Sequence, residues 1–225
     1  MRHIDRLPEP QILTDKHDEW QRKFDEKRKN NPNARPDSTK YGHKNIRAML
    51  DSCSHFKCFY CEATLKGDLK EIDHFKEVAI APELAYTWSN LYLSCHNCND
   101  KLSHNIIPLT DVLDPCSDTD DEIKKNITFE DECICAQPDS EKGLLTIRKF
   151  RLNSDAQDFK RLKWLKIIKD RVIDIQGTMI NEARNQFTEE EKKSLLRFMQ
   201  RDQRYSLMSE MYLRKHLPKL FRGLL

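Results

Sequence analysis

The sequence predicts an α+β protein in which a small core of short strands and four cysteines is embedded in N-terminal and C-terminal α-helices. Two Cys-x-x-Cys pairs, at 58–61 and 95–98, enclose two short apolar segments that are typical of strands. Apolar residues recur every three or four positions on both sides of this core, which indicates helices. Although 34% of the residues are charged, the 10 Phe, 6 Tyr and 3 Trp are sufficient to build a core.

Composition divides the 225 residues into four segments. We expect an N-terminal arm with helices over 1–52, the core over 53–107, an acidic irregular connection with a short strand over 108–153, and a helical region over 154–225. Residues 108–140 hold 10 Asp and Glu against 2 Lys and Arg, whereas residues 141–225 hold 20 Lys and Arg against 11 Asp and Glu. The basic ends of the chain could contact phosphates, or their charges could be solvated helix faces.

The N-terminal segment is expected to begin as an extended arm over 1–10, because this stretch contains two prolines. A charged helix should follow over 15–29, where Trp20 and Phe24 share one face at i, i+4 spacing. After a proline-containing loop, a short helix is predicted over 43–51.

Within the core, the sequence predicts short strands over 69–73 and 91–94. Residues 95–105 should form a turn that leads into a helix. The acidic stretch over 108–141 has few periodic apolar residues and is expected to be irregular, and residues 144–150 are expected to form a strand.

The C-terminal region is predicted to be helical throughout. A long helix should begin after Asn153 or Ser154, since apolar residues recur at helical spacing: Phe159, Leu162, Leu165, Ile168, Val172, Ile175 and Met179. Thr188 and Glu191 have the spacing of a capping box and should open a second helix that ends near Gln200. A last helix is expected over 205–216.

The two Cys-x-x-Cys pairs indicate a structural zinc site. Each pair can supply two thiolates to one tetrahedral Zn2+, so Cys58, Cys61, Cys95 and Cys98 complete four-coordination. The 33 residues between the pairs exceed the spacing of a simple zinc ribbon, so an element is inserted between the halves of the site. A disulfide pair, a redox pair and chance are the alternatives.

The remaining cysteines and nearby histidines are weaker candidates for metal binding. Cys53 and His55 lie close enough to the first pair to substitute in it, but we expect that they do not. His96 is expected to be exposed, and three cysteines of the acidic connection are expected to be free thiols: Cys116, Cys133 and Cys135.

Composition excludes several classes of protein. Only 5 residues are glycine, and neither a phosphate-binding loop nor a dinucleotide-binding fingerprint occurs, so the chain is not expected to be an ATPase or a dinucleotide enzyme by itself. The longest apolar run, over 78–81, is far too short to span a membrane. With no apolar signal region near Met1, we expect a cytoplasmic protein.

Between and after the cysteine pairs, the sequence contains a specific series of polar motifs. Glu71-Ile-Asp73-His74 ends the first expected strand, Asn90-Leu91 begins the second, and Cys98-Asn99-Asp100-Lys101 follows it. In this order, the motifs resemble the HNH endonucleases with a ββα-metal fold. The resemblance covers Cys58 to about Asn105, roughly a fifth of the chain.

The resemblance implies a role for each motif residue. His74 would be the general base, and Asp73 and Asn99 would bind a catalytic Mg2+ or Mn2+ that is separate from the zinc. Asn90 would tie the loop that orients His74. His104 could replace or join Asn99 as a metal ligand, and Lys101 could contact a phosphate, although we favour a solvated Lys101.

The flanking segments resemble one group of HNH proteins, the nuclease component of Septu-type anti-phage defence systems. This resemblance is carried by four segments: 1–10, 82–90, 113–116 and 146–153. It implies cleavage of DNA, an ATPase partner and, in some systems, a retron with its reverse transcriptase and msDNA. Two alternatives stay open: a zinc-stabilised nucleic-acid-binding or scaffold subunit with an inactive site, and a restriction or homing nuclease that acts alone.

The C-terminal helices are the expected contact with the ATPase, because they hold more large apolar residues than a small core can cover. Those singled out for the contact are Trp164, Leu165, Ile168, Met208, Met211 and Tyr212. The alternative is that these helices pack only on one another and on the core.

Overall fold

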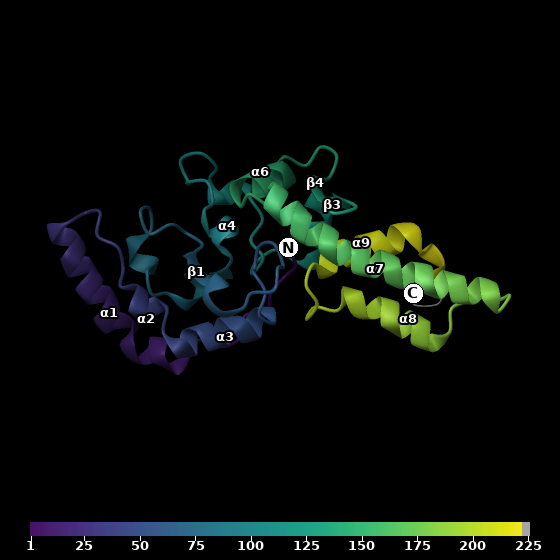
Figure 1. Ribbon diagram of the computed structural model, residues 1–225. Helices are drawn as coiled ribbons and strands as arrows, with labels where there is room; N and C mark the ends of the chain where they lie inside the picture. The colour runs from purple at the N-terminus through teal and green to yellow at the C-terminus, as the bar shows by residue number, and fades with distance from the viewer. Residues whose placement is uncertain (222–225) are drawn as a thin grey trace.

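The computed structural model describes residues 1–221 apart from the side chain of Asp68. The last four residues of the expected 154–225 helical region therefore lie outside the described residues. The molecule is elongated, with the N-terminal helices and the β1–α4 core at one end and three C-terminal helices at the other (Figure 1). None of the helices in the described part of the chain combines the length and apolar character that crossing a bilayer requires.

The described residues form nine α-helices and four short strands, and the strands occur as two consecutive pairs. The α-helices are α1 (Gln11–Asn30), α2 (Ser38–Tyr41), α3 (Lys44–Ser54), α4 (His96–Asn99), α5 (Asp120–Asn126), α6 (Glu141–Lys149), α7 (Asp155–Asn181), α8 (Glu189–Leu196) and α9 (Ser206–His216). The strands are β1 (Glu71–His74), β2 (Leu91–Ser94), β3 (Ile127–Glu130) and β4 (Cys133–Ala136).

The predicted α+β class is confirmed, with two short antiparallel strand pairs among the helices. In the first pair, Glu71 of β1 lies opposite Ser94 of β2, and His74 lies opposite Leu91. Helix α4 follows β2 directly and packs against β1. This ββα unit places α4 beside the start of β1 and the residues just after α4 beside the end of β1, which positions the polar motif residues.

The segment expected to be a strand over 144–150 is helical instead. Helix α6 begins after Ser140, whose hydroxyl accepts a hydrogen bond from the backbone N–H of Gly143. The buried residues Gly143, Thr146, Ile147 and Phe150 recur at i, i+3, i+4 and i+7, which is helical and not strand periodicity. The strand prediction is wrong because the short apolar run has no clear alternation.

The acidic connection is also more regular than expected. The side chain of Thr119 caps α5, which carries three acidic residues in its first turn, where the helix dipole favours negative charge. Helix α5 leads into the β3–β4 hairpin. The isolated apolar residues Ile123, Ile127 and Ile134 are all buried, so a few well-spaced side chains are enough to fix these elements.

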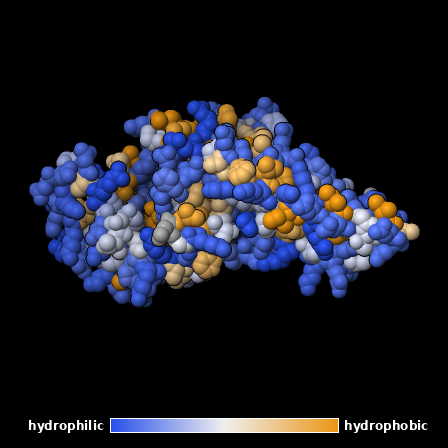
Figure 2. All heavy atoms as spheres, in the orientation of Figure 1, coloured by the Kyte–Doolittle hydropathy of each residue, from blue (hydrophilic) through white to orange (hydrophobic). Residues whose placement is uncertain are grey.

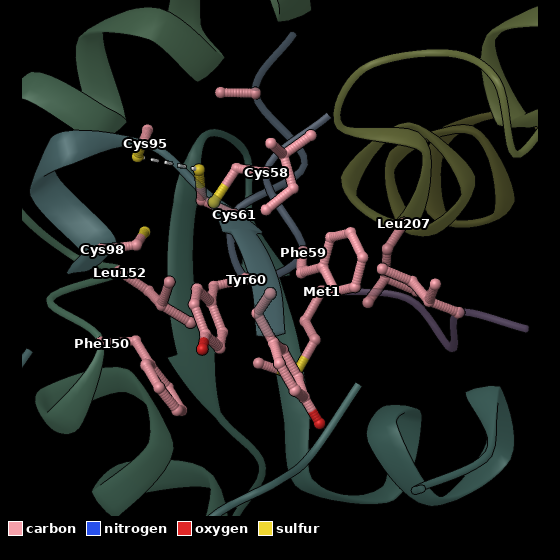
Figure 3. Packing of buried hydrophobic residues seen from close by; sticks show 14 of the residues in the cluster. Met1, Cys58, Phe59, Tyr60, Cys61, Cys95, Cys98, Phe150, Leu152 and Leu207 are labelled. Carbon is pink, nitrogen blue, oxygen red and sulfur yellow. Dashed lines mark hydrogen bonds between the residues drawn. The ribbon is translucent and has the colours of Figure 1, made fainter. Parts of the chain in front are cut away.

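The core under β1 and β2 is a stack of aromatic rings. The ring centres of Tyr60 and Phe150 are 4.2 Å apart, and those of Phe75 and Tyr92 are 4.7 Å apart. The two rings of each pair are nearly parallel. Figure 3 shows Tyr60 and Phe150 beside the cysteine cluster, with Leu152 close by. Since Phe150 follows α6, the ββα unit shares its core with the segment expected to be a mere connection.

The C-terminal helices pack on one another in the predicted order. Trp164 of α7 donates a hydrogen bond from Nε1 to Ser209 Oγ of α9 at 3.1 Å. Helix α8 begins with the predicted capping box of Thr188 and Glu191. Four of the six residues expected to contact a partner are buried inside the chain, so the alternative of internal packing holds for them: Trp164, Leu165, Ile168 and Met208.

Other apolar residues of α7 are exposed instead. Phe159 is 57% exposed, Ile173 is 64% exposed and Ile180 is 78% exposed. Hydrophobic residues are visible along the α7 end of the molecule in Figure 2. Phe159, Ile173 and Ile180 are spaced by multiples of seven residues, so one side of this helix is an apolar stripe, interrupted by the exposed Lys166.

The N-terminal arm joins the two ends of the molecule. Arg2 forms an ion pair with Glu210 of α9, with Nη2 and Oε2 2.7 Å apart. Lys124 of α5 and Arg214 of α9 also donate to Glu210, at 3.0 and 2.9 Å. Burial would raise the pKa of Glu210, but these three cations outweigh it and lower the pKa to about 2.

Candidate functional site

The four cysteines of the two pairs meet in a buried cluster. Their sulfur atoms all lie within 4.8 Å of one another, and Cys61 Sγ is 3.8 Å from Cys95 Sγ. A tetrahedral ion with Zn–S bonds of about 2.3 Å separates its sulfur ligands by about 3.8 Å. Burial raises the pKa of the Cys58 thiol, so four thiolates here need a cation beside them. The donor set therefore fits a zinc ion held by all four cysteines.

A residue of the C-terminal region completes the surroundings of this cluster. Gln157, in the first turns of α7, is fully buried and directs its Nε2 at Cys95 Sγ and Cys98 Sγ, at 3.5 and 3.8 Å. Amide donors of this kind favour the thiolate form of cysteine and tune a metal site. No local pattern identifies Gln157 as a neighbour of the cluster, because it is 59 residues from Cys98 along the chain.

The weaker candidates stay outside the cluster, as predicted. Cys53 Sγ accepts a hydrogen bond from the backbone N–H of Leu7 at 3.4 Å. The His96 side chain is 88% exposed. Cys116, Cys133 and Cys135 are free thiols.

His74 ends β1 with its ring fixed on two sides. Its Nε2 lies 2.8 Å from the carbonyl oxygen of Ala85, and the ring of Tyr41 meets the imidazole edge-on at 4.8 Å. A carbonyl can only accept, so Nε2 carries the proton and Nδ1 of the neutral ring keeps a free lone pair. Burial lowers the pKa of His74, which favours this neutral form.

Asn90 ties together the two chain segments that hold His74. Its Oδ1 accepts from the backbone N–H of Lys76 at 2.7 Å, and its Nδ2 donates to the carbonyls of Lys76 and Leu84 at 3.1 and 3.2 Å. One side chain thus links the residues just after His74 to the residue before Ala85, the partner of the imidazole.

Arg6 of the N-terminal arm binds the loop that ends at Asn90, a contact that the sequence did not predict. Its guanidinium donates to the carbonyls of Trp88, Ser89 and Leu91, at 3.0 to 3.1 Å. It also lies 4.5 Å from the centre of the Tyr92 ring. A single arginine in an extended arm carries no motif, so only the fold reveals this contact.

Asp73 is buried beside Lys101. Lys101 Nζ lies 2.8 and 2.7 Å from the two carboxylate oxygens of Asp73, and 2.6 Å from the carbonyl oxygen of His74. Tyr60 donates its hydroxyl to Asp73 Oδ2 at 2.6 Å. Burial raises the pKa of Asp73, and Lys101 and Tyr60 oppose that rise. The expectation of a solvated Lys101 is wrong, because its side chain is only 5% exposed.

Asn99 lies at the end of α4, facing β1. Its Nδ2 donates to Glu71 Oε2 at 2.6 Å, while Glu71 Oε1 is 2.9 Å from His96 Nδ1. His104, the alternative metal ligand, is not among the residues that line the cavity in front of Asp73. Its backbone N–H donates to Glu77 at 2.8 Å.

One open cavity of about 660 Å³ brings the motif residues together. Asp73, His74, Asn99 and Lys101 all line it. Asp73 and Asn99 offer a carboxylate and an amide oxygen, a hard donor set that suits a Mg2+ or Mn2+ ion with several waters. The set fits such an ion, although Asp73 would have to share its carboxylate with Lys101.

The antiparallel strands, the short helix and the paired cysteines form a ββα unit with a metal-binding cysteine cluster, and the comparison with protein families matches the same segment. Residues 58–105 match the family model described as HNH endonuclease. The chain therefore carries an HNH endonuclease domain in this segment, as the sequence motifs predicted.

Two curated relatives extend the similarity beyond this domain. The chain is 30% identical to the Septu protein PtuB of Bacillus thuringiensis over 115 residues, which cover 50% of this chain and 43% of the relative. It is 26% identical to the Septu protein PtuB of Bacillus mycoides (strain KBAB4) over 167 residues, which cover 60% of this chain and 56% of that relative. The chain thus spans about half the length of these relatives, and the resemblance to Septu proteins is confirmed.

Proposed function

We propose that the chain is a metal-dependent endonuclease that hydrolyses phosphodiester bonds of DNA in the cytoplasm, as the effector of an anti-phage defence complex. One observation carries the nuclease function: Asp73, His74, Asn99 and Lys101 line a single open cavity, and the imidazole of His74 is fixed by the Ala85 carbonyl. The similarity to Septu proteins supports the defence role.

In this proposal, His74 Nδ1 accepts a proton from the attacking water. Asn90 and Tyr41 keep the ring in the orientation that this transfer needs. Asp73 and Asn99 would hold the divalent ion, which supplies charge stabilisation for the phosphate and the leaving oxygen when bound. Lys101 would keep the buried Asp73 ionised, and so maintain its carboxylate as a ligand.

The test is plasmid cleavage by His74→Ala, with His17→Ala as the matched control. His17 is a partly exposed histidine of α1 that pairs with Asp18 and lies outside the cavity. We expect loss of at least ~100-fold in rate for His74→Ala, with unchanged DNA binding, and no change for His17→Ala. Cleavage by both variants at the wild-type rate would exclude His74 as the base.

Dependence on metal is tested on the zinc-loaded protein. Removing free Mg2+ and Mn2+ should stop cleavage, and adding either ion should restore it. DNA binding without cleavage under any of these ions would favour the alternative of a zinc-stabilised scaffold with an inactive site.

We also propose that an ATPase subunit binds the C-terminal helices, in some systems together with a retron. The exposed apolar stripe of α7 supports this, with Phe159, Ile173 and Ile180 as its contacts. Co-expression with the adjacent gene, followed by affinity purification and identification of the retained protein, tests it. The wild type should retain the ATPase, whereas Ile173→Asp should release it. Purification of the wild type without the ATPase would contradict the proposal.

A further inference from the structure

The far wall of the catalytic cavity comes from outside the matched HNH segment. Arg28 of α1, Arg35 of the following loop and Tyr41 of α2 line the same cavity as Asp73 and His74. Figure 1 shows α1 and α2 at the same end of the molecule as β1. A group bound next to His74 is therefore enclosed between the HNH domain and the N-terminal helices.

Both arginines have donors to spare. Within residues 1–221, no carboxylate forms an ion pair with either guanidinium, and the hydrogen bond of Arg28 to the Val78 carbonyl is long, at 3.4 Å. Both acidic residues that line this cavity are already engaged. Glu77 binds Lys149 at 3.2 Å and the backbone of His104 at 2.8 Å, and Asp73 binds Lys101. The wall opposite the motif residues is thus positively charged.

The basic surface continues past Arg35 into a second hollow. Arg35 lines both cavities, and the second one, of about 290 Å³, is also lined by Lys27 and Lys40. Asp37 lies there too, but its carboxylate caps α2 and accepts from the N–H of Thr39 at 2.9 Å. Lys40 Nζ lies over the buried ring of Trp20, at 5.9 Å, so aromatic residues form the floor of this hollow.

The outer side of α1 differs. There, Lys16 pairs with Glu19 and Arg22 pairs with Glu26, whereas Lys23, which also pairs with Glu19, lines the second hollow. The solvated pairs of Lys16 and Arg22 offer little to an anion. Arg28, Arg35, Lys27 and Lys40, none of which has an ion pair within the described residues, line the two connected hollows instead.

We propose that this wall is a binding site for the sugar-phosphate backbone of DNA, in which Arg28 and Arg35 hold phosphates next to the bond that is cleaved. Lys27 and Lys40 extend the track along the backbone. Guanidinium groups suit this task because their planar donors match phosphate oxygens. The inference rests on the proposed function, since the cavity is taken as the site of DNA cleavage.

The experiment measures binding of a fluorescein-labelled 20-base-pair DNA duplex to the full-length chain at several NaCl concentrations, without added Mg2+ or Mn2+. The test variant is Arg28→Gln with Arg35→Gln, and the control is Lys16→Gln with Arg22→Gln. Both lose two positive charges from the N-terminal segment. Circular dichroism and zinc content verify that both are folded.

K here is the association constant of the protein for the duplex, and its logarithm falls linearly with log [NaCl]. Loss of two phosphate contacts should make this slope less steep by about 1.8 in the test variant and leave it unchanged in the control. Equal slopes in both variants, with wild-type cleavage intact, would overturn this inference but not the nuclease function. A reduced slope in a chain that never cleaves DNA would keep the binding site and overturn the nuclease function. No binding of the duplex by the wild type would overturn the binding site.

Discussion

Phe150 tests whether the HNH domain depends on the segment that follows it. Its ring is fully buried, and its centre lies 4.2 Å from that of Tyr60, which stands between Cys58 and Cys61 in the sequence. Phe159, nine residues later, is 57% exposed on α7. The same substitution at the two positions therefore separates core packing from the loss of a phenyl ring as such.

The structure sets the size of the effect. Truncating a buried phenylalanine costs about 3–5 kcal/mol, and the lost stacking on Tyr60 belongs to the upper part of this range. Since domains are stable by only about 5–15 kcal/mol, Phe150→Ala should unfold at a much lower urea concentration. Phe159→Ala should change the free energy of unfolding by less than about 0.5 kcal/mol.

Urea unfolding followed by circular dichroism is the assay, with zinc release to a chelator as a second readout. Phe150→Ala should release zinc faster, because the ring supports the turn that carries Cys58 and Cys61. Phe150→Leu, which keeps most of the apolar volume, should fall between the wild type and the alanine variant. A loss below about 1 kcal/mol for Phe150→Ala would refute the shared core.

Three further predictions concern the zinc cluster and the join between the two ends. Purified protein should contain about one zinc per chain, and Cys58→Ser should lose the zinc and much of its stability; folded zinc-free wild type would contradict this. Gln157→Leu should weaken zinc binding about 10-fold in competition with a chelator while the fold persists in excess zinc, and unchanged affinity would exclude the role of its amide. Glu210→Gln should lower the free energy of unfolding by about 2 kcal/mol at pH 7, after allowance for solvent screening. The reason is that the pKa of Glu210 in the folded protein, about 2, lies below its usual 4.5. That difference should be constant above about pH 5 and shrink as the pH falls towards 2, since only then is the carboxyl protonated in both states; a difference that grows on acidification would refute it.

Local patterns were sufficient to predict the cysteine cluster and most helices. The spacing of the 58–61 and 95–98 cysteine pairs predicts a metal site. The capping box at Thr188 and the apolar period of α7 are local signals that predict their helices. The strand predicted over 144–150 is wrong, because which of its residues are buried depends on contacts with distant segments. The buried residues have helical spacing, and the sequence of the segment alone does not show this. The ammonium of Lys101 turned inward for the same reason, since its partner Asp73 lies 28 residues away.

Side chains that act across the fold left no local pattern at all. Arg6, Tyr41 and Gln157 reach the HNH segment from three other parts of the chain, and nothing in their neighbours announces this. Sequence reasoning could name the motif residues, including Asn90, but not the residues outside the motif that hold them in place.

The shared core has a consequence for how variants of this chain are interpreted. The matched segment 58–105 is completed by Phe150, Gln157 and Arg6, so it is not a portable cassette that can be excised or grafted onto another protein. Inactivating substitutions far from the cavity should therefore be common in a mutational scan, and many of them will report misassembly of the domain. Only variants that keep both zinc and cooperative unfolding can be assigned to the chemistry itself.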